Sequence, residues 1–289
     1  MKNFFKKDEL KYLWPFYGDF LIATTLILYP AFFVIYLLNI DFTLTQIGFL
    51  MSTQALAMLL FEIPTGAVAD IFGRKLSTIL GYILMIITFI GMFLTKDFYM
   101  FLGLFFLLGI SWTLISGAQV AWVVDLLKGK KREHLIEEYF IKKQSFMNIS
   151  LFLAGIIGAL IVKYFGLRVI FLVSALGMMI GLVFFLFGEE VFVKKKRKLK
   201  DHYKELISNT KEAFVYSSKH KVISYLMIIT FISMVAVAFT SQMTWQPFFL
   251  DNGFQEHWFG YLFSAAMLLG IFVPYITKAL LKASKKHKY

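Results

Sequence analysis

Two acidic residues, Asp19 and Glu62, lie inside long apolar stretches of the sequence. A carboxylate at the centre of a membrane helix costs roughly 2.5–3.5 kcal/mol even on lenient scales, so such residues usually face a cavity and serve a function. Loss of hydration favours the protonated form, which suits a group that binds and releases protons. Both residues are therefore candidates for carrying protons. The alternative is that both reach the headgroups or pair with basic residues such as Lys11.

A charged turn joins two apolar runs and reads Gly-Ala-Val-Ala-Asp-Ile-Phe-Gly-Arg-Lys over residues 66–75. It leaves no room for a soluble loop, so it must lie at the face of a membrane. The planar fork of Arg74 offers five donors and can bridge Asp70 and Asp125, which ends a later apolar run at the same face. Glycines let helices approach and allow unusual turn conformations. The residues singled out are Gly66, Asp70, Gly73, Arg74, Lys75 and Asp125. The simpler alternative is a topology anchor with a tight turn.

Aromatic residues and scattered amides or hydroxyls occur within several apolar runs and suit an adaptable, largely apolar substrate pocket. The alternatives are hydrogen bonds that hold helices together and aromatic belts at the membrane interfaces. The candidates for the pocket are Tyr29, Trp112, Ser116, Gln119, Gln144, Asn148, Gln242, Trp245 and Gln246.

The apolar runs that contain these residues place the chain in the all-α class, as a polytopic membrane protein. Hydrophobic residues make up 59% of the sequence and the mean hydropathy is +0.71. About eight runs approach or exceed the roughly 20 residues that cross the hydrocarbon layer. Continuous apolar runs exclude the alternating strands of a barrel. The expected spans are 14–38, 45–69, 77–94, 98–124, 140–162, 168–188, 222–249 and 258–276.

The basic residues are distributed unevenly between the two sides of these spans. Of the 30 Lys and Arg, only Lys96, Lys163 and Arg168 fall on one side. This positive-inside pattern predicts a multi-pass protein of the cell membrane with both termini in the cytoplasm. The net charge of +12 is thus explained by topology and by anionic lipid, and it does not indicate a nucleic-acid partner.

The sequence lacks the residues that several kinds of chemistry require. The sequence has no cysteine, and its five histidines are far apart, which predicts no metal site. It has no phosphate-binding Gly-rich loop with Lys and Ser or Thr, so ATP-driven transport has no support. Nothing resembles a catalytic constellation. We therefore expect a protein that is not an enzyme and needs no cofactor.

The polar segments suggest how the chain is organised. Residues 189–221 form the longest polar stretch and open with a basic run. They separate an amino-terminal six-helix half, 1–188, from the first two helices of a second half, 222–289, and transporters are commonly built of such repeated halves. The charged segment 126–143 is expected to form a short surface helix.

The turn at residues 66–75 resembles the signature of the major facilitator superfamily, Gly-x-x-x-Asp-x-x-Gly-Arg-Lys, at every fixed position. Residues 116–125 resemble a stretch of its drug-efflux-like members, except that Val120 stands where many relatives carry Glu. The resemblance implies secondary transport by alternating access, with a small-molecule substrate and protons as partners and with efflux as the direction. It also implies that the charged turn latches a gate by contact with the second half.

The family fold has twelve helices, and the sequence predicts about eight, which points to an incomplete fold. We therefore expect a truncated or split protein, completed by a separately encoded carboxy-terminal fragment. Two alternatives stay open: a nutrient uptake permease of the same superfamily, and a non-functional remnant.

The topology can be tested by labelling, because an introduced cysteine is the only thiol in the chain. Cysteines placed singly at Asn39, Asp97 and Asn252 should react with an impermeant thiol reagent added outside intact cells. A cysteine at Ser208 should react only after permeabilisation. Labelling at Ser208 in intact cells would overturn the predicted orientation.

Overall fold

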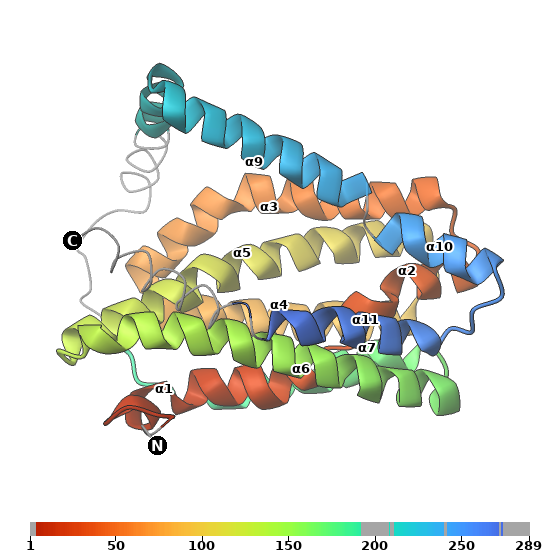
Figure 1. The fold of residues 1–289 in the computed structure, drawn as a ribbon, viewed down its shortest axis with the longest axis horizontal. Coiled ribbons are helices and arrows are strands. Elements are labelled where there is room, and N and C mark those ends of the chain that lie inside the picture. The colour runs from red at the N-terminus through yellow and green to blue at the C-terminus, as the bar shows by residue number, and fades with distance from the viewer. Residues whose placement is uncertain (1–3, 192–207, 209–210, 240–241, 272, 274–289) are drawn as a thin grey trace, which may run out of the picture.

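The computed structural model describes residues 4–191, 208, 211–239, 242–271 and 273, and its helices form an elongated bundle (Figure 1). Within these residues, six segments are long and apolar enough to cross a membrane. They are Glu9–Asn39, α3 (Leu44–Phe72), α4 (Arg74–Leu94), α5 (Phe98–Gly129), Glu133–Phe165 with α6 (Ile136–Phe165), and α7 (Val169–Leu186). The expected all-helical, multi-span architecture is confirmed.

The last two expected spans are described as shorter helices. They comprise α9 (Lys221–Phe239), α10 (Gln242–Asp251) and α11 (Trp258–Gly270). Most side chains of residues 221–234 are exposed, and Figure 1 shows α9 at the margin of the bundle, beyond α3. The basic run at the start of the linker lies outside the described residues.

The first span is interrupted, whereas the sequence predicted one helix over 14–38. It consists of α1 (Glu9–Gly18), a π-turn (Asp19–Ala23), a 3-10 turn (Thr24–Leu26) and α2 (Tyr29–Asn39). Side chains of other helices satisfy the freed backbone groups. The Ser174 hydroxyl accepts hydrogen bonds from the N–H groups of Leu28 and Tyr29, at 3.0 and 3.1 Å. The break is stable because lipid cannot supply these partners and α7 does.

Sequence signals define two of the helix starts. Thr43 and Gln46 form a reciprocal capping box at the start of α3. The Asp97 carboxylate accepts a hydrogen bond from the N–H of Met100 and caps α5. Gly73 alone separates α3 from α4, and its φ of 111° is a conformation that favours glycine. The expected tight turn is therefore a one-residue link.

The segment between α5 and α6 differs from expectation. No separate surface helix forms over 126–143, because α5 continues to Gly129 and α6 begins at Ile136, with a short 3-10 turn between them. The charges at 128–132 instead lie at the end of α5 and in the following turn, and those at 142–143 lie in the second turn of α6. Together with the α3–α4 turn, the start of α1 and the end of α7, they form one end of the bundle, which we call the basic end.

Helices α6 and α11 pack closely along their length, side by side in Figure 1. At their closest approach, a β-carbon on Gly155 or Gly260 would overlap the backbone carbonyl of the other residue. Small residues of this kind allow membrane helices to pack by direct backbone contact. Two hydrogen bonds lie nearer the basic end, from Asn148 to the Gly270 carbonyl at 2.8 Å and from Ser145 to the Ile271 carbonyl at 3.3 Å.

Replacing Gly155 with alanine should force the two helices apart. The expected cost is about 1–3 kcal/mol of stability, as for other overpacked cores, visible as a lower Tm in detergent. Gly117→Ala is the matched control, because a β-carbon on Gly117 of α5 meets nothing within 4 Å. A Tm equal to wild type in Gly155→Ala would contradict the close packing of α6 and α11.

Candidate functional site

The predicted charge cluster is assembled from three helices at the basic end. The Arg74 guanidinium lies 2.6 Å from an Asp70 carboxylate oxygen and 3.6 Å from one of Asp125. These side chains are 26%, 18% and 51% exposed, respectively. Ion pairs of this exposure contribute about 0–1 kcal/mol. The cluster can therefore form and break at little cost.

Lys75 has a partner that the sequence did not reveal. Its ammonium donates hydrogen bonds to the carbonyls of Leu186 and Gly188, at 2.8 and 2.9 Å. These carbonyls belong to the end of α7, where a cation is favoured by the helix dipole. In return, the Glu190 carboxylate accepts the Lys75 backbone N–H at 3.0 Å, near the positive start of α4. The turn and the end of α7 are thus joined by reciprocal contacts.

A second pair of contacts ties the end of α7 to α5. The Trp122 indole N–H donates to the Glu189 carbonyl at 2.7 Å, and Lys130 forms an ion pair with the Glu189 carboxylate at 2.7 Å. The hydrogen bond between the two charges lowers the pKa of Glu189 and raises the pKa of Lys130. Trp122 is fully buried, so this corner is firmly packed.

Gly66 was expected to allow close approach of helices, and the described structure shows no such contact at this position. A β-carbon there would meet no other described atom within 4 Å. Close helix approach therefore does not explain a glycine at this position. Gly73 differs, because its positive φ and the nearby Glu190 carboxylate both restrict it.

Asp19 lies in the π-turn of the first span and is buried at 3% exposure. The Tyr82 hydroxyl donates a hydrogen bond to its carboxylate at 2.8 Å. Gly181 of α7 passes so close that a β-carbon there would overlap the carboxylate. Lys143 of α6 interacts with it electrostatically, and sequence distance alone hid this basic neighbour. A single-turn π-segment often marks a functional position.

Glu62 has a different environment. It is exposed on α3, and its side chain has no hydrogen bond or ion pair with a described residue. The two acids look alike in sequence, but only Asp19 is enclosed by protein. The snorkelling alternative therefore fits Glu62 better than Asp19.

The structure does not gather the pocket candidates at one place. Trp112, Ser116 and Gln144 are exposed, whereas Tyr29 and Trp245 are partly buried. Asn148 and Gln246 donate hydrogen bonds to backbone carbonyls of other helices, as the alternative of polar contacts between helices predicted. The side chain of Gln242 lies outside the described residues.

Gln119 is a pocket candidate that also interacts with the candidate proton carrier Asp19. It is 6% exposed, and its amide nitrogen has no hydrogen-bond partner within the described part of the chain. It interacts with Asp19. Its amide is therefore placed to donate a hydrogen bond to the Asp19 carboxylate.

Ion pairs of the amino-terminal segment were also missed. Glu9 and Lys142 form a buried pair, and Asp8 pairs with Arg132 at 2.8 Å. The hydrogen bond from Arg132 lowers the pKa of Asp8. The sequence signal was the acidic pair Asp8 and Glu9 within a basic amino-terminal segment. For the prediction of topology, this segment counted only as part of the positively charged side.

Lys75→Met should loosen the end of α7 while leaving the Arg74 cluster in place. We expect a stability loss of about 1 kcal/mol, typical of a charged hydrogen bond at a helix end. Hydrogen exchange in the peptides that cover residues 182–191 should also accelerate. Lys96→Met, at an exposed lysine of the opposite end, is the control. Unchanged exchange in Lys75→Met would show that the contacts do not hold α7.

Comparison with known proteins agrees with the all-helical membrane fold. The family model described as Major Facilitator Superfamily matches residues 16–288. The uncharacterized MFS-type transporter YxaM of Bacillus subtilis is 25% identical over 268 residues, covering 91% of this chain and 64% of that protein. The uncharacterized transporter BU466 of Buchnera aphidicola is 28% identical over 239 residues, covering 80% of this chain and 56% of that protein. The chain thus spans less than two thirds of the length of these curated relatives. It belongs to the Major Facilitator Superfamily.

Proposed function

We propose that this chain takes part in secondary active transport of a small molecule by alternating access, driven by protons and directed outward. The observation that carries the proposal is Asp19, a carboxylate enclosed by α4, α5, α6 and α7 at a break in the first span. A buried carboxylate with one hydroxyl donor and a nearby lysine can exist with or without its proton. Proton exchange at such a group can drive transport.

The proposed orientation places the basic end in the cytoplasm. The asymmetry of lysine and arginine supports it. Asp19 then lies in the cytoplasmic half of the first span, and anionic lipid of the inner leaflet surrounds the basic end. The localisation that follows is the cell membrane.

The cluster of Asp70, Arg74 and Asp125 is the proposed gate. Its ion pairs are partly exposed and weak, whereas the contacts from Lys75 to α7 join helices within the same half. A gate needs ion pairs that break easily. The helices that carry the gate need contacts that keep them together. In this proposal, the cluster alternates between partners while the α3–α4 turn and α7 stay together.

The proposed substrate class is a largely apolar small molecule. The exposed side chains of Trp112 and Ser116 share one face of α5, which combines an aromatic surface with a hydroxyl group. Gln119, one turn away from Ser116, adds a buried amide beside Asp19. A few polar groups on an apolar surface favour such ligands.

The decisive experiment compares Asp19→Asn with Glu62→Gln in proteoliposomes. Both this chain and a version extended with the remaining sequence of a longer relative are reconstituted, and ethidium is the first probe. Asp19→Asn should still bind ethidium but lose proton-driven accumulation, since asparagine cannot release a proton. Glu62→Gln should retain accumulation.

The direction of the imposed proton gradient distinguishes export from uptake. Accumulation against a gradient in Asp19→Asn would refute the proposed coupling. Loss of accumulation in Glu62→Gln but not in Asp19→Asn would assign the coupling role to Glu62 of α3.

A further inference from the structure

Helix α1 has one buried face and one exposed face. The buried face is formed by Glu9, Leu13, Phe16 and Tyr17. Leu10, Lys11 and Trp14 are exposed, and residues three and four apart are neighbours on a helix surface. These three side chains therefore form one stripe, which we call the exposed stripe. It combines an ammonium group with apolar surface at the basic end.

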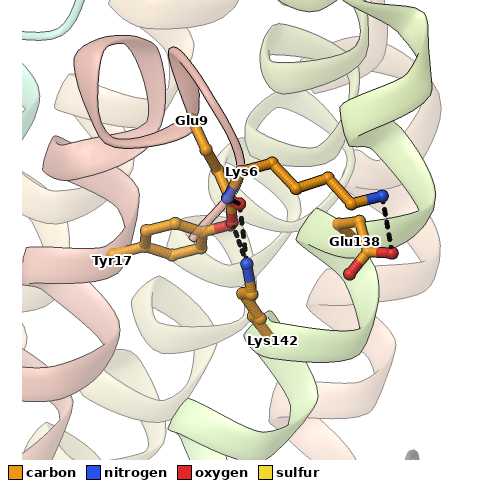
Figure 2. A network of polar contacts seen from close by, with 5 residues as sticks. All are labelled: Lys6, Glu9, Tyr17, Glu138 and Lys142. Atoms are coloured by element: carbon orange, nitrogen blue, oxygen red, sulfur yellow. Dashed lines mark hydrogen bonds and ion pairs between the residues drawn. The ribbon is translucent and has the colours of Figure 1, made fainter. Parts of the chain in front are cut away.

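A buried ionic network holds the inner face of α1 against α6 (Figure 2). The Glu9 carboxylate is fully buried and accepts hydrogen bonds from the Lys142 ammonium at 2.7 Å and the Tyr17 hydroxyl at 2.6 Å. Beside it, Lys6 forms an ion pair with Glu138 of α6 at 2.9 Å. Breaking a buried ion pair is strongly destabilising. The rotation of α1, and with it the direction of the exposed stripe, is therefore fixed.

Basic side chains converge beside the exposed stripe. The ammonium groups of Lys11 and Lys130 both lie 5.5 Å from the centre of the Tyr12 ring. Lys7, in the turn before α1, and Lys11 both interact electrostatically with Asp8. Two ammonium groups that share one ring repel each other, and an anion placed between them would offset this repulsion.

The nearby carboxylates do not balance these cations. Lys7 and Lys11 are exposed and form no ion pair within the part of the chain that the structure describes. The two carboxylates of this region are already engaged, at 2.7 and 2.8 Å, in the pairs Lys130–Glu189 and Arg132–Asp8. The described residues here therefore carry an excess of positive charge, which an anionic group from outside the protein would neutralise.

Apolar surface continues from the exposed stripe to the end of α7. Trp14 is 43% exposed, and its ring lies against those of Phe184 and Phe187, with centroids 6.0 and 6.5 Å away. Phe187 is 68% exposed. Trp14 lies about 4.5 Å further into the first span than Lys11. A phospholipid presents an anionic phosphate and then hydrocarbon in the same order, whereas a free phosphate ion has no apolar part.

We propose that α1, the α5–α6 turn and the end of α7 bind one anionic phospholipid, with its phosphate beside Lys7, Lys11 and Lys130 and an acyl chain along Trp14 and Phe187. This site is more specific than the general attraction of a basic surface for anionic lipid, because its lysines are carried by a helix that is fixed against α6. Each lysine near the membrane surface favours anionic lipid by roughly fivefold. The proposed orientation places the site in the inner leaflet, and only this choice of leaflet rests on the proposed function.

The test is quenching of Trp14 fluorescence by brominated lipids in vesicles. The purified chain is reconstituted in phosphatidylcholine that contains the same minor fraction of either brominated phosphatidylglycerol or brominated phosphatidylcholine. The contribution of Trp14 to the quenching is identified by its loss in Trp14→Phe. Brominated phosphatidylglycerol should quench Trp14 several-fold more than brominated phosphatidylcholine, because the lysines enrich the anionic lipid beside this ring.

The double variant Lys7→Gln with Lys11→Gln should abolish this excess quenching. The matched control is Lys96→Gln with Lys163→Gln, which removes two exposed lysines at the opposite end of the bundle. Lys163 resembles Lys11 in that its ammonium lies over the ring of the next residue, a tyrosine, at 5.7 Å. The control variant should keep the excess quenching.

Three outcomes would overturn the proposal: equal quenching by the two lipids in the wild type, an excess that persists in Lys7→Gln with Lys11→Gln, or an equal loss of the excess in the control variant. Soluble glycerol phosphate at the concentration of the anionic lipid should not remove the excess. Its removal would assign the site to a free phosphate ester and refute the lipid.

The readout does not depend on transport, so Asp19→Asn should keep the excess quenching. Excess quenching together with proton-driven accumulation in Asp19→Asn would refute the coupling role of Asp19 and leave the lipid site standing. Equal quenching by the two lipids, together with accumulation that depends on Asp19, would refute only the lipid site.

Discussion

Lipid offers no hydrogen-bond partner to a peptide group, so every break in a membrane helix must be satisfied by another part of the protein. The break between Asp19 and Leu28 depends on this constraint. Ser174 of α7 accepts the two N–H groups that follow the break, and the Ser150 hydroxyl of α6 donates to the Phe20 carbonyl. Two serines from distant parts of the sequence therefore fix the first span in its broken form. The break in turn places a carboxylate among four helices.

The charges of the basic end occur in two environments, and the difference has physical meaning. The Arg74 cluster and the pair of Lys130 with Glu189 are partly exposed, so water and ions weaken them. The pair of Glu9 with Lys142 is shielded from both. A shielded pair is costly to separate, because each partner would be left as a buried charge. The partly exposed pairs can therefore exchange partners during motion, whereas the shielded pair holds the start of α1 against α6.

Much of the fold follows from the sequence, because the length of apolar runs is a strong signal. The first six spans, the tight turn at Gly73 and the uneven distribution of lysine and arginine were all readable. The break at Asp19 was not, because the hydroxyl groups that stabilise it come from residues 150 and 174. The same applies to Lys75, whose partners lie more than a hundred residues away. Periodicity reports the local helix, but a pairing of this kind depends on tertiary packing.

The site was only partly readable for a related reason. Arg74 could be placed between Asp70 and Asp125 because all three end apolar runs at one membrane face. Asp19 and Glu62 looked alike in sequence, since both interrupt an apolar run. Burial separates them, and burial depends on which face of each helix meets a neighbour. The exposed positions of Trp112 and Ser116 depend on the same information.

Helix α7 connects two distant parts of the bundle mechanically. Its end is held by the Lys75 ammonium at the α3–α4 turn, and Gly181, two turns earlier, lies against the Asp19 carboxylate. The distance along the helix from Gly181 to Leu186, whose carbonyl Lys75 contacts, is roughly 8 Å. Over such a length a packed helix behaves as a stiff rod. A shift of the charged turn would therefore displace α7, and with it Gly181, relative to the Asp19 carboxylate.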